Sequence, residues 1–98
     1  MRVLIQACIP VQTGNRALKD GTLQNTMMGF IERVRPEAAY FGLESGQRTG
    51  YFVVDLKESS DLPPLLEPLF TNLDAEVKVT PIMNAEDLKK GLSKLGKT

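Results

Sequence analysis

Apolar residues recur with two different periods along this 98-residue chain, and these periods predict its secondary structure. Runs of β-forming residues predict strands, and apolar residues spaced three and four apart predict helices. Strands are expected at residues 3–9, in the two halves of 36–56 and at 75–80, and helices at 22–34, from 62 to 70 and from 84 onward. The predicted order is therefore β-α-β-β-α-β followed by one more helix.

The middle of the chain, residues 36–56, predicts a hairpin whose central turn residues are Ser45 and Gly46. This turn places Tyr40 opposite Tyr51, and opposed residues share a face of the sheet. One face is apolar and is expected to lie under the helices: Ala39, Phe41, Leu43, Gly50, Phe52, Val54 and Leu56. The other face carries Ala38, Tyr40, Gly42, Thr49, Tyr51, Val53 and Asp55.

Two segments carry conflicting signals. After the first strand ends at Pro10, the stretch around Thr13 predicts a turn or cap, and residues 16–20 predict only a helical turn or two. The second helix contains Pro68, which removes a backbone hydrogen bond, so a short, bent or partly 3₁₀ helix is expected there. In the last helix, Asn84 and Asp87 have the spacing of a capping box.

The outer strands extend the same division into two faces. The usual sheet for this element order is 4-1-3-2, with the first and third strands in the centre. Its second face is then centred on Gln6, Cys8, Tyr51 and Val53, and Tyr40 and Lys78 flank it. That surface is too apolar to be bare and too polar for an ordinary core, so a second subunit or a ligand is expected to cover it.

Composition limits the class of protein. The length fits a single domain spanning residues 1–98, and a formal net charge of zero gives no general attraction to nucleic acid or to an acidic membrane. The first ten residues are too short and too polar for a signal peptide, and no window is long enough to span a membrane. The single cysteine, Cys8, excludes an internal disulfide and suits a reducing compartment, so a cytoplasmic location is expected.

The pattern resembles the dimeric α+β barrel superfamily, small ferredoxin-like domains whose sheets pack face to face. The resemblance rests on the element order, on residues 50–56 (GYFVVDL) leading into 59–70 (SSDLPPLLEPLF), and on residues 81–92 (PIMNAEDLKKGL). It implies an antiparallel sheet in a homodimer. The superfamily includes cofactor-independent monooxygenases and muconolactone isomerase-like enzymes, but a shared fold does not transfer an activity.

The chain has no histidine, so a histidine-dependent mechanism is excluded. Asp55 is the sharpest catalytic candidate, since it is an acid at the end of a central strand, but an ion pair with Arg2 is the favoured interpretation. Tyr40 and Tyr51 are expected to pair across the strands and to contact either a planar ligand or a partner subunit. Cys8 is a candidate nucleophile, but a small buried thiol without a catalytic role is the favoured interpretation.

Other ligand classes have less support. Gln6 can orient a ligand or bridge two subunits, whereas Lys78 fits a solvated edge charge. Neither a metal nor a cofactor is expected, because no cysteine pair or carboxylate cluster has ligand spacing. The RNA recognition motif shares this element order, but residues 3–9 offer no aromatic side chain for base stacking.

Three functions remain open at this point. The first is a homodimer that binds a small apolar or aromatic molecule between its sheets, at Gln6, Cys8, Tyr40, Tyr51 and Asp55. The second is a cofactor-free isomerase or monooxygenase-like enzyme that uses Asp55, Tyr51 and Gln6. The third is a structural dimer without a ligand, in which these side chains fill the interface.

Overall fold

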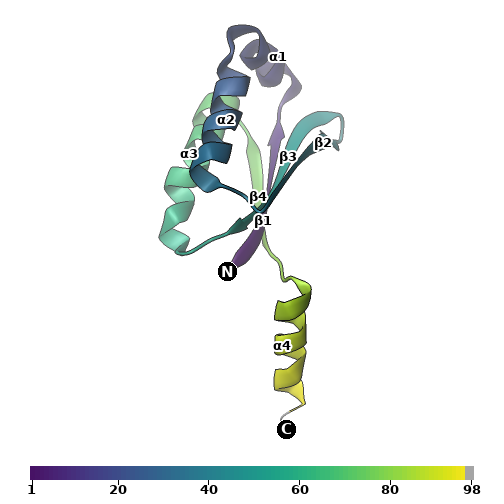
Figure 1. Ribbon diagram of the computed structural model, residues 1–98. Helices are drawn as coiled ribbons and strands as arrows, with labels where there is room; N and C mark the ends of the chain where they lie inside the picture. Colours follow the sequence, from purple (N-terminus) through teal and green to yellow (C-terminus); the bar gives the residue numbers. More distant parts are fainter. Residues whose placement is uncertain (97–98) are drawn as a thin grey trace.

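The computed structural model describes residues 1–96 and is a small α+β fold (Figure 1). Its four strands form one antiparallel sheet in the order β2-β3-β1-β4. The strands are β1 (Arg2–Ile9), β2 (Ala38–Glu44), β3 (Gln47–Asp55) and β4 (Glu76–Pro81). β1 and β3 are central, as predicted, and numbering the same sheet from its β4 edge gives 4-1-3-2. This arrangement is compatible with a ferredoxin-like fold.

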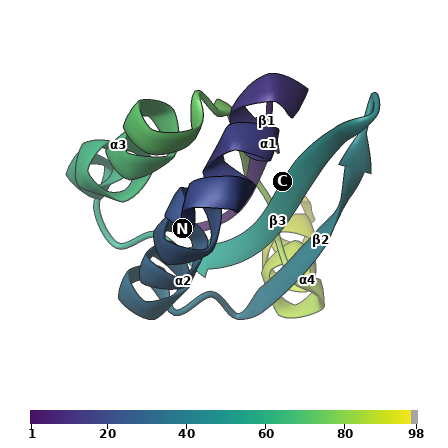
Figure 2. The same ribbon diagram turned by 90° about the horizontal axis from the view of Figure 1, so that it is seen from above.

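Helices cover only one face of the sheet (Figures 1 and 2). They are α1 (Val11–Asp20), α2 (Thr22–Val34) and α3 (Leu62–Leu73), the last preceded by a short 3₁₀ turn, η1 (Ser59–Asp61). A fourth helix, α4 (Ala85–Leu95), follows β4 and projects beyond the end of the sheet. The described molecule is therefore elongated, with extents of 57 × 27 × 17 Å.

Two helices differ from the sequence-based expectation. α1 begins directly after Pro10, where a turn was predicted, and it packs through the small residues Thr13, Gly14 and Ala17 instead of a stripe of large apolar ones. α3 is a continuous α-helix of 12 residues that contains Pro68, so it is neither short nor partly 3₁₀ over Leu62–Leu73. The burial of Leu66, Leu69 and Leu73 holds α3 in place despite the missing hydrogen bond.

The hairpin register is confirmed. Tyr40 lies opposite Tyr51, and the turn residues Ser45 and Gly46 have φ values of 50° and 76°. Two successive residues with positive φ make the type I′ turn that matches the right-handed twist of the strands. This turn places every residue of β2 and β3 on its predicted face.

The core lies between the sheet and its helices. β1 alternates strictly, and Phe30 of α2 meets Phe52 of β3 edge to face with ring centroids 4.8 Å apart. One expectation is wrong: Phe41 and Leu43 point to the helix side but are 60% and 72% exposed. The reason is that the β2–β3 hairpin extends away from the helices, so the outer half of β2 has no cover (Figure 2).

Candidate functional site

The open face of the sheet, which no helix covers, is the candidate site. Three cross-strand rows build it, because opposed residues of neighbouring strands share a face. The rows are Ala38–Val53–Leu4–Thr80, Tyr40–Tyr51–Gln6–Lys78 and Gly42–Thr49–Cys8–Glu76. Leu4, Gln6, Cys8, Tyr51 and Val53 are half-buried within the single chain. The structure thus brings Gln6, Cys8, Tyr40 and Tyr51 into two adjacent rows, whereas Asp55 lies on the same face at the far end of β3.

A hollow of about 380 Å³ opens on this face at the hairpin end. Its lining comes from β1, the hairpin tip and β4: Gln6, Cys8, Glu44, Ser45, Gln47, Glu76, Val77 and Lys78. Within the described chain, the side chains of Gln6, Gln47 and Lys78 make no hydrogen bond or ion pair. The hollow therefore offers unused donors and acceptors beside the aromatic rings of the face.

Tyr51 does not stack on Tyr40, although the two residues are directly opposed. Its hydroxyl instead donates a 2.6 Å hydrogen bond to Glu44 Oε1. The Tyr51 ring passes beside Gly42, where a Cβ would lie 3.7 Å from Tyr51 Cε2, an ordinary van der Waals separation. The carboxylate raises the pKa of Tyr51 to about 12, which keeps the phenol protonated at neutral pH.

Tyr40 is 70% exposed, and its ring is the most accessible one on the open face. Cys8 is half-buried, and Thr49 Oγ1 lies 3.4 Å from its sulfur. The same hydroxyl lies 3.0 Å from the carbonyl oxygen of Gln47, so its single proton can be donated to only one of the two at a time.

Asp55 lies away from the other candidates. It follows Tyr51 by four residues on β3, which is about 13 Å along a strand. The favoured pair with Arg2 is wrong, although the two residues are opposed. Asp55 instead pairs with Lys57 at 2.8 Å and with the N-terminal ammonium at 3.5 Å, while Arg2 pairs with Glu37 and Asp87. The hydrogen bond from Lys57 lowers the pKa of Asp55.

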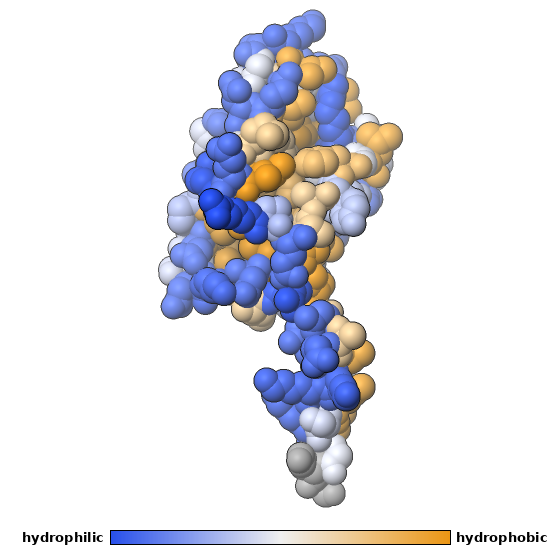
Figure 3. Space-filling view, in the orientation of Figure 1, coloured by the Kyte–Doolittle hydropathy of each residue, from blue (hydrophilic) through white to orange (hydrophobic). Residues whose placement is uncertain are grey.

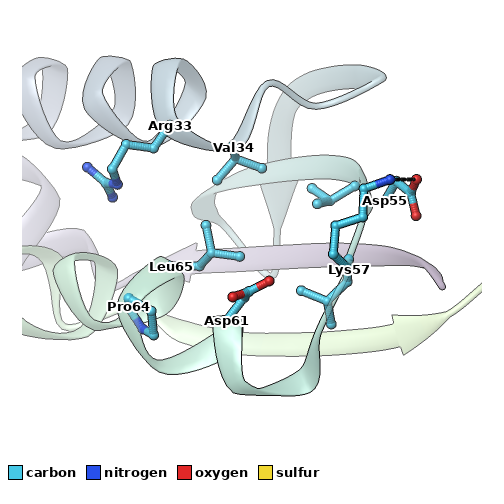
Figure 4. Close-up of a pocket in the computed structure, with 9 residues that line it drawn as sticks. Arg33, Val34, Asp55, Lys57, Asp61, Pro64 and Leu65 are labelled. Atoms are coloured by element: carbon cyan, nitrogen blue, oxygen red, sulfur yellow. Dashed lines mark hydrogen bonds and ion pairs between the residues drawn. The ribbon is translucent and has the colours of Figure 1, made fainter.

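Asp55 and Lys57 border a different hollow, of about 430 Å³, on the helix side of the sheet (Figure 4). Figure 4 shows the two side chains paired with each other on one side of this hollow and Arg33 on the other. The start of α3 also lines the hollow, but prolines at positions 63 and 64 remove two of the amide donors that would bind an anion there. The helix-side hollow therefore has no convergent set of polar groups.

Sequence reasoning did not single out Glu44, Gln47 or Glu76 as site residues. The hairpin turn gave the face of Glu44, but nothing in the sequence indicated that the hairpin tip and the start of β4 border one hollow. Lys78, expected to be a solvated charge, is exposed and also lines it.

No helix among residues 1–96 has both the length and the apolar character needed to cross a membrane. Within the same residues, no group of three or more histidine, cysteine, aspartate or glutamate side chains has the arrangement of a metal site. Comparison with protein-family models, with curated proteins and with solved structures gave no match.

Proposed function

We propose that this protein is a cytoplasmic ferredoxin-like homodimer of the dimeric α+β barrel type, and that its two open sheet faces enclose a small-molecule site. The observation that carries the proposal is the mixed character of the open face. Half-buried Leu4 and Val53 lie beside Gln6 and Lys78, whose polar groups have no partner within the described residues.

The apolar part of this surface supports a second copy as its cover. Stacked sheets pack about 10 Å apart, which leaves room for side chains from both faces and for a flat ligand where side chains are short. In the row of the open face that lies toward the hairpin tip, the side chains of Gly42, Thr49 and Cys8 are all short. Their positions favour a gap near the hairpin end, beside the hollow.

The expected ligand is a planar aromatic molecule with a neutral oxygen substituent. Tyr40 and Tyr51 supply ring faces, and the Gln6 amide and the Lys78 ammonium supply donors. Glu44 and Glu76 border the same hollow, so a carboxylate or phosphate would meet like charges there. A hydroxyl or carbonyl group avoids that cost.

The enzyme alternative has less support. Its three residues do not converge within one chain, because Asp55 lies about 13 Å along β3 from Tyr51. Tyr51 is not a general base near neutral pH, since its pKa is raised to about 12 by Glu44. A dimer without a ligand remains the competing outcome of the experiment below.

The test combines light scattering with a titration of 1-naphthol, a flat aromatic alcohol, followed by fluorescence at micromolar protein. We expect a mass of two chains and saturable binding. Gln6→Leu should weaken binding about three- to tenfold, the effect of losing one hydrogen bond. Gln24→Leu, a matched change on the exposed surface of α2, should leave binding unchanged.

A monomeric mass would refute the proposal. A dimer that shows no saturable binding of 1-naphthol would favour the ligand-free structural alternative. Equal losses in Gln6→Leu and Gln24→Leu would place the binding site away from the open face.

A further inference from the structure

An apolar groove runs on the helix side of the sheet, beside the outer half of β2. Its volume is about 240 Å³, and β1, α2 and the hairpin line it: Ile9, Leu23, Met27, Phe41, Gly42, Arg48, Thr49 and Gly50. Phe41 is 60% exposed there, and no helix covers this part of the hairpin (Figure 2). The groove therefore holds apolar side chains that only a bound molecule would remove from water.

Of the residues that line this groove, only Arg48 is charged. Arg48 is half-buried, yet it forms no ion pair within residues 1–96. Its Nη2 donates a 3.1 Å hydrogen bond to Asn15 Oδ1, and its other N–H groups have no acceptor in the described chain. Partial burial lowers the effective dielectric constant around this charge, which strengthens its attraction for an anion.

α1 fixes the position of the Arg48 guanidinium. A Cβ at Gly14 would lie 2.5 Å from Arg48 Nη1 and 3.5 Å from its Cζ, so the guanidinium lies against α1 where a side chain is absent. The hydrogen bond to the next residue, Asn15, holds the same group from a second atom. An arginine positioned in this way loses little conformational freedom when it binds an anion, which favours affinity.

The groove has room for a short alkyl chain attached to that anion. Arg48 shares a cross-strand row with Ile9, and the row of Phe41 and Gly50 lies one step further from the hairpin tip. A chain that starts at Arg48 would run along Phe41 and the apolar side chains of α2. If each carbon takes roughly 30 Å³, the volume of one water molecule, the groove holds a chain of about eight carbons.

The charge of the groove favours a monocarboxylate. The Arg48 guanidinium can bind a carboxylate through two parallel N–H···O hydrogen bonds. No second cation lines the groove, so a phosphate dianion would keep one charge unpaired. An alkylammonium would be repelled by Arg48, and an alcohol would gain no ion pair.

The competing occupant is α4 of a second copy. Figure 3 shows apolar side chains gathered along one side of α4 and polar ones along the other, and its Leu88 and Leu92 are 45% and 55% exposed. Lys89 flanks these leucines on the helical wheel, while Asp87 on the other flank is held in the capping box. Arg48 would repel Lys89, so the groove matches a small anion better than it matches α4.

We propose that the groove beside Phe41 binds a short unbranched monocarboxylate, with its carboxylate on Arg48 and its alkyl chain between Phe41 and α2. The groove lies on the opposite face of the sheet from the proposed dimer contact, so this second site does not depend on that proposal. A bound chain would join the hairpin to α2 and cover the part of β2 that the helices leave exposed.

The test titrates octanoate into protein labelled with ¹³C at the methionine methyl groups and follows these signals by NMR. Met27 lines the groove, whereas its neighbour Met28 is 57% exposed and does not, so the two provide matched probes. Met27→Leu and Met28→Leu assign the two signals. We expect octanoate to shift the Met27 signal with a dissociation constant of about 1 mM or below, as for a good ligand of about ten non-hydrogen atoms. The Met28 signal should not move.

The role of Arg48 is tested with ligands of the same chain length and with matched variants. Octan-1-ol should bind about tenfold more weakly than octanoate, and octylammonium more weakly still, because the charge-assisted hydrogen bonds are lost. Arg48→Gln should weaken octanoate binding about tenfold and leave octan-1-ol binding unchanged. Arg33→Gln removes the same charge beside the other helix-side hollow and should change octanoate binding less than about twofold.

Four outcomes would overturn the proposal. A Met27 signal that octanoate does not shift refutes the site, and equal shifts of the Met27 and Met28 signals show non-specific binding. Equal affinity for octanoate, octan-1-ol and octylammonium refutes the role of Arg48, and this comparison holds even if Arg48→Gln does not fold. If α4 fills the groove instead, Leu88→Ser/Leu92→Ser shifts the Met27 signal without any ligand. The sheet-to-sheet dimer is tested separately by light scattering, so either proposal can fail while the other stands.

Discussion

Gly50 provides the sharpest test of the hairpin register on which the candidate site depends. It lies on the helix side of β3, directly before the Tyr51 that faces the other way. A Cβ at Gly50 would lie 2.8 Å from both Cε2 and Cζ of Phe52 and 3.4 Å from Cε1 of Phe41. We expect Gly50→Ala to destabilise the protein.

The magnitude follows from how little the Phe52 ring can move. Carbon atoms prefer separations of about 3.5 Å or more, so the ring would have to shift by about 0.7 Å. Phe52 is fully buried and packs edge to face on both Phe30 and Phe41. Overpacking of this kind costs about 1–3 kcal/mol, and replacing glycine returns about 0.4–1 kcal/mol by restricting the unfolded chain. The net loss should be about 1–2 kcal/mol, or about 4–16 °C in Tm.

Gly42→Ala is the matched control, because it is a strand glycine of the same hairpin whose added Cβ meets Tyr51 Cε2 at an ordinary 3.7 Å. It should be neutral or stabilising by up to about 1 kcal/mol. Urea unfolding is measured at two protein concentrations, which separates folding from self-association. Equal stability of Gly50→Ala and Gly42→Ala would mean that Gly50 does not face Phe52. The placement of Tyr51 on the open face would then fail as well.

Three further outcomes are expected. In a spectrophotometric titration one of the two tyrosines should ionise near pH 12, and Glu44→Gln should lower the pKa of that tyrosine. Because the folded-state pKa of Tyr51 is raised, its hydrogen bond contributes fully to the free energy of unfolding below about pH 10. This contribution is lost as the pH rises toward 12. The lowered pKa of Asp55 contributes stability above about pH 4 that is lost as the pH falls further, so Asp55→Asn should flatten the acid limb of a denaturation-against-pH curve. Pro68→Ala should raise the free energy of unfolding by about 1–3 kcal/mol in urea, since it restores an amide donor inside α3; a decrease would show that the proline ring is needed for packing.

The sequence predicted the sheet well because its signals are local. Alternation in β1 assigns Val3 and Ile5 to the core, and a Ser45-Gly46 turn fixes the register of two strands at once. Only the second half of α1, residues 16–20, was predicted to be helical. Its buried side chains are as small as Gly14 and Ala17, so the helix carries no stripe of large apolar residues to detect.

The candidate site was predicted less completely, because its contacts join residues from different elements. The hydrogen bond from Tyr51 to Glu44 runs diagonally across the two strands, with the Tyr51 ring beside Gly42. The sequence prediction considered only directly opposed residues, so it did not find this contact. The partners of Asp55 were also missed. Lys57, two residues further along the chain, forms the ion pair with the Asp55 carboxylate. Arg2 is directly opposed to Asp55 but pairs with Glu37 instead.

The residues that build the fold and those that define the candidate site alternate along the same strands. Ile5 and Phe52 are completely buried under the helices, whereas Gln6 and Tyr51, their neighbours in sequence, point to the open face. Because a strand gives every second side chain to each face, the open face can change its chemistry while the core stays intact. The fold therefore specifies where a ligand or a partner would lie without specifying which one. The identity of that ligand or partner must depend on polar side chains of the open face that the fold does not need. Gln6 and Lys78 are the first of these to test, because they have no partner within residues 1–96.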